Sequence, residues 1–299
     1  MKKALVIYLS ILVGLFAVLF VLGHKGDYTV ERKAWKLYQK HIDIAKDPVV
    51  IPDRTFEDVI AEYEKIISQH PDSRLTPGLH IRLGEVYALK KDYAQARKIF
   101  NDIIKLHPEN QELSAEAMFK IGQTHEFERN WVEANKVYNV IIREYSKTDT
   151  AMRVPIYIAN YYRNENDFQR TMEAYEVAVR YYKKMASDHD NTRVGLNATR
   201  YLSNCYLEQN RWAEAVETLG VVIEKYVDSG YLTIENADMT IKTINIVSAY
   251  QLQDYDIAIK LYQGIIDRNP GHRLNGYLEK VIDAFHQLRG KGVEASDLK

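Results

Sequence analysis

The chain has 299 residues, of which 46% are hydrophobic and 27% are charged, and its 40 basic and 41 acidic residues leave a net charge of −1. These proportions are typical of a folded protein with a solvated surface, and the lack of a basic excess argues against a nucleic-acid partner. A single cysteine, Cys205, excludes an intramolecular disulfide.

The N-terminus carries an uncharged run of 19 residues, from Ala4 to Leu22, directly after Met1-Lys2-Lys3. As a helix this run would reach roughly 28 Å, which is close to the hydrocarbon thickness of a bilayer. A secretory signal has a shorter apolar core and a small-x-small cleavage site, whereas Val21-Leu22-Gly23 is a poor site. The sequence therefore predicts an uncleaved signal anchor over residues 1–26, with Gly14 inside the transmembrane helix. Cleavage as an export signal is the alternative.

Two features predict opposite orientations for this span. Lys2 and Lys3 with the free amine are typical of a bacterial export signal, which keeps the N-terminus in the cytoplasm. Four basic residues follow the span between positions 25 and 36, and the positive-inside rule would keep that side in the cytoplasm. We expect export, because the whole N-terminus is organised as an export signal. The expected location is the bacterial inner membrane, single-pass, with the remaining chain in the periplasm.

After the span, residues 27–45 carry Trp35, Tyr38 and Ile42 at helical spacing. This pattern predicts a helix, and Pro48 predicts its end.

One motif recurs six times in the rest of the chain. It consists of an aromatic residue, a small or β-branched residue three positions later, a Tyr, Phe or Leu after four more, and an aliphatic residue or Ala after three more. The clearest copy is Tyr93, Ala96, Phe100 and Ile103. These steps place the motif on one helical face. The leading aromatic residues are 37, 38, 37, 44 and 43 residues apart, which predicts a helical repeat array. A polar insertion, residues 187–191, lengthens the fourth interval.

The most regular copy lies in the 34 residues from Pro77 to Asn110. Its first helix carries Leu83-Gly84 and Tyr87 on one face, and Asp92 is placed to cap the second helix. Together with the motif, this pattern resembles the tetratricopeptide repeat (TPR). The resemblance implies an all-α, right-handed α-solenoid of helix pairs that binds proteins or peptides. The spacing of the motif residues from Tyr63 to Pro71 is also similar to that of bacterial envelope TPR proteins.

The motif register predicts one solenoid over residues 27–299. Its six units are expected near residues 31–71, 77–110, 115–148, 152–185, 196–229 and 240–272. Residues 274–288 form an amphipathic helix that is expected to cap the end of the array. Small residues such as Gly84 and Gly122 are expected to let paired helices approach closely.

No pattern in the sequence predicts catalysis or a cofactor. His125-Glu126 begins like a zinc-protease motif, but Arg129 stands where the second histidine is needed. Asp188-His189-Asp190 lies in the polar insertion, and we interpret it as a solvated loop. Neither a phosphate-binding glycine loop nor a nucleophile elbow is present. We expect no enzymatic activity, no metal, no cofactor and no small-molecule substrate.

The TPR resemblance also implies a binding face on the first helices of two successive units. In that family the inward face includes the second, fifth, ninth and twelfth helix positions. The polar residues that match are Arg153, Asn160, Arg163, Asn197, Arg200 and Asn204. An asparagine at the same position of both units could hold a peptide backbone, and the arginines suit a carboxylate. Ile156 replaces a cation of the family's carboxylate clamp, so the clamp would be incomplete. A solvated polar face is the alternative interpretation.

These patterns together predict a membrane-anchored interaction scaffold of the bacterial envelope, which binds a partner protein or peptide in its groove. The expected partners are envelope or membrane proteins. One alternative is a permanent structural subunit of a larger membrane complex, and another is a soluble periplasmic TPR factor released by signal cleavage. An open polar groove would favour the scaffold, whereas extended exposed apolar patches would favour the subunit.

Overall fold

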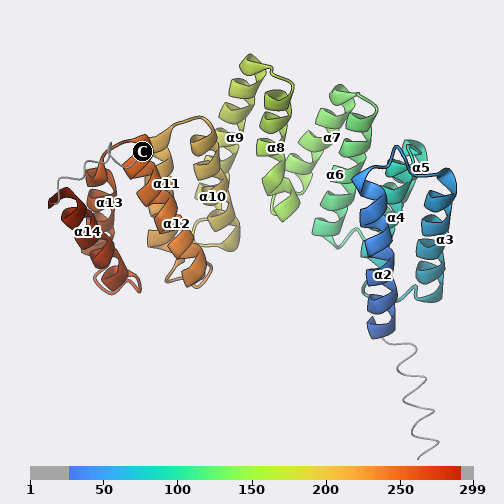
Figure 1. The fold of residues 1–299 in the computed structure, drawn as a ribbon, viewed down its shortest axis with the longest axis horizontal. Helices are drawn as coiled ribbons and strands as arrows, with labels where there is room; N and C mark the ends of the chain where they lie inside the picture. Colours follow the sequence, from blue (N-terminus) through green and yellow to red (C-terminus); the bar gives the residue numbers. More distant parts are fainter. Residues whose placement is uncertain (1–26, 291–299) are drawn as a thin grey trace, which may run out of the picture. The chain divides into compact units, whose positions relative to one another are not determined.

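The computed structural model describes residues 27–290, and every regular element in that range is helical (Figure 1). The all-α prediction is therefore confirmed for these residues. The predicted span with Ala4, Gly14 and Leu22 lies outside the described residues. From residue 27 to residue 290, none of the helices combines the length and the apolar composition that a membrane crossing requires.

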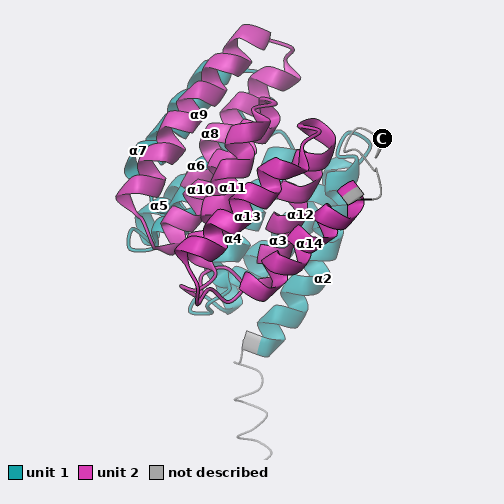
Figure 2. Cartoon of the chain, turned by 90° about the vertical axis from the view of Figure 1, so that its left-hand side faces the viewer, with its two compact units in different colours: residues 1–150 teal, residues 151–299 magenta. Residues whose placement is uncertain are grey.

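The chain divides into two compact units at residue 150 (Figure 2). In unit 1, consecutive helices pack against each other, and the first helices of successive pairs are also in contact, α2 with α4 and α4 with α6. Its helices are α2 Asp27–Lys46, α3 Asp53–Gln69, α4 Thr76–Leu89, α5 Tyr93–Leu106, α6 Gln111–Phe127 and α7 Trp131–Glu144. This arrangement is a stack of helix pairs, as the repeat spacing predicted.

Unit 2 continues the alternation, beginning with a helix that starts just before the boundary. Its elements are α8 Asp149–Asn164, α9 Phe168–Asp188, α10 Arg193–Glu208, α11 Trp212–Tyr226, α12 Ile234–Ile246, the π-helical turn η1 Val247–Gln251, α13 Tyr255–Arg268 and α14 Asn275–Gly290. Here α10 packs against both α9 and α11, while α11 contacts α13, the second helix of the next pair. The same pairwise stacking is therefore present in both units.

Five of the helix pairs turn in the same way between their two helices. One residue adopts a positive φ between 53° and 67°, and these residues are Lys91, Arg129, Asn166, Asn210 and Gln253. Each stands two positions before the aromatic residue that begins the second helix. At Asp92 the side chain accepts a hydrogen bond from the backbone N–H of Gln95 at 3.1 Å, so the predicted N-cap is confirmed.

Two glycines of the first helices lie directly against aromatic rings of the second helices. A Cβ added at Gly84 would stand 2.4 Å from Cε1 of Phe100, and one at Gly122 would stand 2.3 Å from Cε1 of Tyr138. Such contacts are far below van der Waals separation, so each ring fits only because the glycine has no side chain. The predicted close approach at these small residues is confirmed.

The last helix pair departs from the predicted boundaries. Helix α12 begins at Ile234, earlier than the predicted start at Thr240. The reason is local, because Thr233 caps the helix by accepting a hydrogen bond from the backbone N–H of Asn236 at 3.3 Å. The helix then continues into η1, whose π-helical turn is wider than an α-helical turn. The regular repeat spacing does not predict the extra residue in this turn.

The polar insertion at residues 187–191 is only partly a loop. Helix α9 continues to Asp188, so the start of the insertion lengthens the helix. The turn that precedes these residues is anchored by burial, since Tyr182 and Met185 are 0% and 7% exposed. The hydroxyl of Tyr182 also donates to the backbone carbonyl of Met152 in α8 at 2.6 Å. The interpretation of residues 188–190 as a loop was therefore wrong at Asp188.

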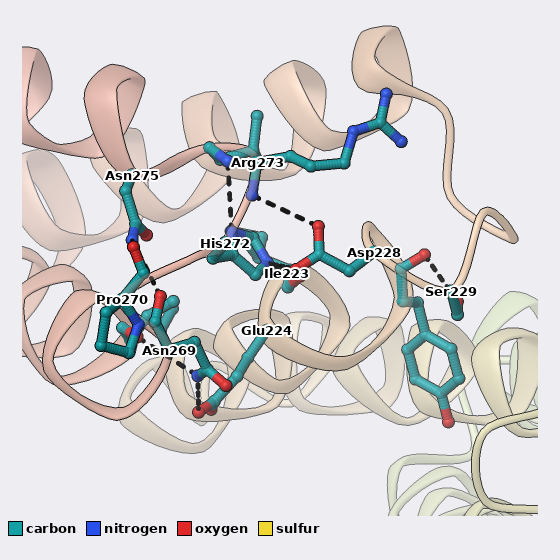
Figure 3. Close-up of polar contacts among 12 residues, drawn as sticks. Ile223, Glu224, Asp228, Ser229, Asn269, Pro270, His272, Arg273 and Asn275 are labelled. Carbon is teal, nitrogen blue, oxygen red and sulfur yellow. Dashed lines mark hydrogen bonds and ion pairs between the residues drawn. The ribbon is translucent and has the colours of Figure 1, made fainter.

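The turn before α14 is fixed to α11 by a buried histidine, His272 (Figure 3). Its Nδ1 accepts from the backbone N–H of Leu274 at 3.2 Å, so its Nε2 carries the hydrogen and donates to the carbonyl of Ile223 at 3.2 Å. Beside it, Glu224 accepts hydrogen bonds from Asn269 and from Arg268. These contacts position the terminal helix against the last pair.

Candidate functional site

Buried tyrosines of the second helices reach across their pairs to polar side chains of the first helices. The hydroxyl of Tyr175 donates to Oδ1 of Asn160 at 2.8 Å, and that of Tyr262 donates to Oδ1 of Asn245 at 2.7 Å. Tyr138 makes the corresponding bond to Glu126. All three tyrosines occupy the third position of the repeat motif. The fold therefore uses a core residue to orient a polar group on the first helix.

Orientation of the amide matters for what Asn160 can bind. Its oxygen already accepts the hydroxyl hydrogen of Tyr175, which leaves the amide nitrogen as the donor end of the side chain. Asn160 is half-buried, so this donor lies at the edge of the core rather than in free solvent. A fixed donor of this kind suits a carbonyl oxygen of a ligand.

The equivalent asparagine of the next pair, Asn204, has a different environment. Leu219 stands at the motif position in α11, so no hydroxyl holds the Asn204 amide. Asn204 and Arg200 are both exposed on α10, and within residues 27–290 neither side chain makes a hydrogen bond or ion pair. Both side chains can therefore bind a ligand, although binding would cost the entropy of ordering them.

Arg163 already has a carboxylate partner within the chain. Its guanidinium pairs with Glu208, which joins the end of α8 to the end of α10. A ligand carboxylate would therefore have to compete with Glu208 for the Arg163 guanidinium. The ion pair also holds the two first helices together. Of the other predicted residues, Arg153 is exposed on α8 and Asn197 is half-buried on α10.

Sequence reasoning missed Asn245, which has the same tyrosine contact as Asn160. Part of the signal was present, because Tyr262 occupies the motif position of Tyr175. However, Asn160 lies 15 residues before its tyrosine whereas Asn245 lies 17 residues before its tyrosine, and the π-helical turn η1 lies between Asn245 and Tyr262. Counting back from Tyr262 by the regular separation leads to Val247, so the repeat register alone does not find Asn245.

Unit 1 contains a charged cluster that sequence reasoning also missed. Glu85 on α4 pairs with Lys120 on α6 at 2.6 Å and with Arg82 at 3.1 Å. Burial would raise the pKa of the Glu85 carboxyl, but attraction to Lys120 and Arg82 outweighs this and keeps the pKa below its usual value. Two cations thus share one carboxylate. The pairing could have been suspected, because Arg82 and Lys120 stand at the same position of successive units.

The same cluster borders a buried histidine on α2. His41 is 6% exposed, and its Nδ1 lies 3.3 Å from the hydroxyl oxygen of Tyr63. Burial lowers the pKa of His41, which favours the neutral ring at neutral pH. The positive charge of this cluster therefore comes from Arg82 and Lys120.

Stacked helix pairs, repeated turns with one positive-φ residue and glycine-to-aromatic contacts define an α-helical repeat protein with TPR-like helix pairs. A family model described as the RMD9 middle domain matches residues 56–238. This match covers more than half of the chain, and the chain belongs to the RMD9 middle domain family. That family differs from the bacterial envelope TPR proteins that the sequence resembles.

Among the solved structures that match, two illustrate a distant similarity, and no curated protein matches the chain. The crystal structure of BtubC (BKLC) from P. vanneervenii has a TM-score of 0.39 and 10% identity, over 86% of this chain and 92% of that one. The TPR2AB-domain:pHSP90-complex of yeast Sti1 has a TM-score of 0.33 and 14% identity, over 87% of this chain and 97% of that one. The fold assignment rests on the helix pairs described above.

Proposed function

We propose that the protein is a non-catalytic interaction scaffold that holds an extended segment of a partner protein against α8 and α10. The observation that carries this proposal is the tyrosine-held amide of Asn160, with Asn204 at the equivalent position of the next pair. The Asn160 donor is oriented before a ligand arrives, which reduces the entropy lost on binding. Amide donors recognise backbone carbonyls and so tolerate many sequences.

A carboxylate of the partner is expected to add to this binding. Arg200 lies one helical turn before Asn204 on α10 and carries no partner within the described residues. Its planar guanidinium can donate two parallel hydrogen bonds to a carboxylate. Arg163 contributes less, because Glu208 already neutralises it. The proposed ligand is therefore an extended segment with an acidic side chain or C-terminus near Arg200.

A random-peptide display library, selected against the purified full-length protein, tests this function. Recovered peptides should bind the wild type and should lose about tenfold or more in affinity when Arg200→Ala and Asn204→Ala are combined. The matched control combines Arg180→Ala on α9 with Glu217→Ala on α11, because both residues are exposed on second helices. Peptides that bind the Arg200 and Asn204 variant as tightly as the wild type would refute the site.

We also propose that residues 4–22 anchor the scaffold in a bacterial inner membrane, with the repeats in the periplasm. The support is the uncharged run itself and the export-signal organisation around it. The mass of the native protein should retain these residues. Protease added to intact spheroplasts should digest the repeats. Protection until lysis would place them in the cytoplasm instead.

A permanent structural subunit is the second candidate function, and one observation favours it. Met239, Ile246 and Tyr250 are 65%, 55% and 45% exposed, and they follow one another at helical spacing along α12 and η1. Such an apolar stripe suits a stable protein contact. A subunit would stay in one large assembly in mild detergent, and Met239→Ser with Ile246→Ser would release it. A scaffold with an exchangeable ligand would run at its own mass in both forms.

A further inference from the structure

The first helices of unit 1 surround a hollow of about 450 Å³. Its walls come from α2, α4 and α6, three helices that are distant in sequence, with Phe100 of α5 at its base. Most of the lining is apolar and includes Ile42, Leu89 and Phe127, the last of which is 57% exposed. This volume is in the range of cavities that hold a bulky side chain or a small ligand.

A second hollow of about 420 Å³ adjoins the first along α2 and α4, with Tyr63 of α3 also in its lining. The two hollows share Tyr38 and Arg82, and the guanidinium carbon of Arg82 lies 4.5 Å from the centre of the Tyr38 ring. Trp35, which is 64% exposed, lines the second hollow. The hollows are therefore two parts of one groove, divided by a stacked pair of side chains. An elongated ligand fits this form better than a compact one.

The positive and negative side chains that line the groove do not balance. Arg82 and Lys120 share the single carboxylate of Glu85. The other charged residues of the lining are paired within unit 1: Lys46 with Asp43 at 2.7 Å, and Glu31 with Arg74 at 2.7 Å. One positive charge is left unbalanced beside an apolar surface. That charge is complementary to an acidic side chain.

We propose that this groove of unit 1 is a second binding site, which takes an extended acidic segment carrying two bulky apolar side chains. One apolar side chain enters the hollow beside Phe127, and the other enters the hollow beside Trp35. An aspartate or glutamate between them meets Arg82 and Lys120. This site goes beyond the proposed function, because it lies in the other unit and depends on apolar anchors instead of backbone contacts.

The test uses the full-length protein and a short fluorescein-labelled peptide with two tryptophans separated by aspartates. Fluorescence anisotropy should show saturable binding that weakens as salt is added. A peptide with asparagines in place of the aspartates should bind about tenfold more weakly or worse. In the variant that combines Arg200→Ala with Asn204→Ala, which lacks the first proposed site, a peptide with alanines in place of the tryptophans should not bind measurably. Equal binding of all three peptides would overturn the proposal.

Two substitutions locate the binding on the protein. Ala45 is exposed and lines the first hollow, so Ala45→Trp should fill it and abolish binding without disturbing the core. Its control is Ala94→Trp, at an exposed position of α5 outside both hollows. Full binding by the Ala45 variant, with circular dichroism unchanged, would place the peptide elsewhere and overturn the site.

The charge is tested separately at Lys120. Lys120→Gln should weaken binding of the aspartate peptide about tenfold, whereas Lys120→Arg should retain it. Lys98→Gln on α5 removes an exposed cation outside the groove and should have no effect. Substitution of Arg200 and Asn204 should not change the affinity for the aspartate peptide. A negative result at one site therefore does not refute the proposal for the other site. Binding of a naphthalene sulfonate dye in the hollow without binding of the peptide would overturn the proposed ligand class.

Discussion

Tyr175 donates its hydroxyl hydrogen to Oδ1 of Asn160 across 2.8 Å, and this bond couples the core of a helix pair to the surface of its first helix. The ring is 2% exposed, while the asparagine is half-buried at the surface that we propose for binding. A change inside the core can therefore alter a surface amide without contact with the ligand.

Tyr175→Phe should show this coupling. Loss of one hydrogen bond should lower the free energy of unfolding by about 1 kcal/mol, measured by urea denaturation. Peptide affinity should also fall, because the Asn160 amide is no longer oriented. The control is Tyr231→Phe, at an exposed tyrosine in unit 2, which should change neither quantity. Unchanged affinity in the Tyr175 variant would show that the amide orientation is irrelevant to binding.

Gly84→Ala should destabilise the protein, because its new Cβ would stand 2.4 Å from the Phe100 ring. Overpacking of this kind costs about 1–3 kcal/mol, which urea denaturation resolves. Gly78 lies in the same helix with no atom near its missing Cβ. Gly78→Ala should therefore be neutral or stabilising by up to about 1 kcal/mol. Equal effects at both glycines would contradict the packing described for α4 and α5.

Cys205 is the only cysteine and is fully buried in α10. Burial raises the pKa of its thiol to about 12, so at pH 8 almost none is thiolate. A disulfide reagent should therefore label the native protein very slowly, and should label one thiol per chain in urea. Rapid native labelling would mean that α10 opens readily from α9 and α11.

Glu85 should contribute stability that depends on pH. Its pKa is lower in the folded protein than in the unfolded chain, so the contribution is present above the unfolded value of 4.5 and is lost as pH falls through the folded value. The wild type should be more stable than Glu85→Gln at pH 7, and this difference should shrink below about pH 4.5. Other carboxyls titrate in both proteins and cancel in the comparison. A pH-independent difference would contradict the pairing with Lys120 and Arg82.

The repeat motif predicted much of the fold because its residues act locally or within one pair. Asp92 caps the helix that follows it, and Gly84 packs against a ring in the next helix. The start of α12 could not be predicted from the period, since a threonine cap and the π-helical turn η1 override it locally.

The candidate sites were harder to predict than the helices. Asn160, Arg200 and Asn204 are proposed as binding residues because the family register marks their positions. The pairing of Arg163 with Glu208 depends on how two helices from different pairs approach, which the register does not contain. The groove of unit 1 needs three helices that are distant in sequence, so no local pattern indicates its volume or its shared carboxylate.

A photoreactive amino acid at position 204 of the full-length protein in its native membranes tests the central claim most directly. On irradiation it should form a covalent adduct with a partner, and mass spectrometry should place the attachment in one extended segment of that partner. The same amino acid at position 180, on the exposed side of α9, should form no such adduct. Adducts from position 180 but none from position 204 would contradict binding at the face of α8 and α10.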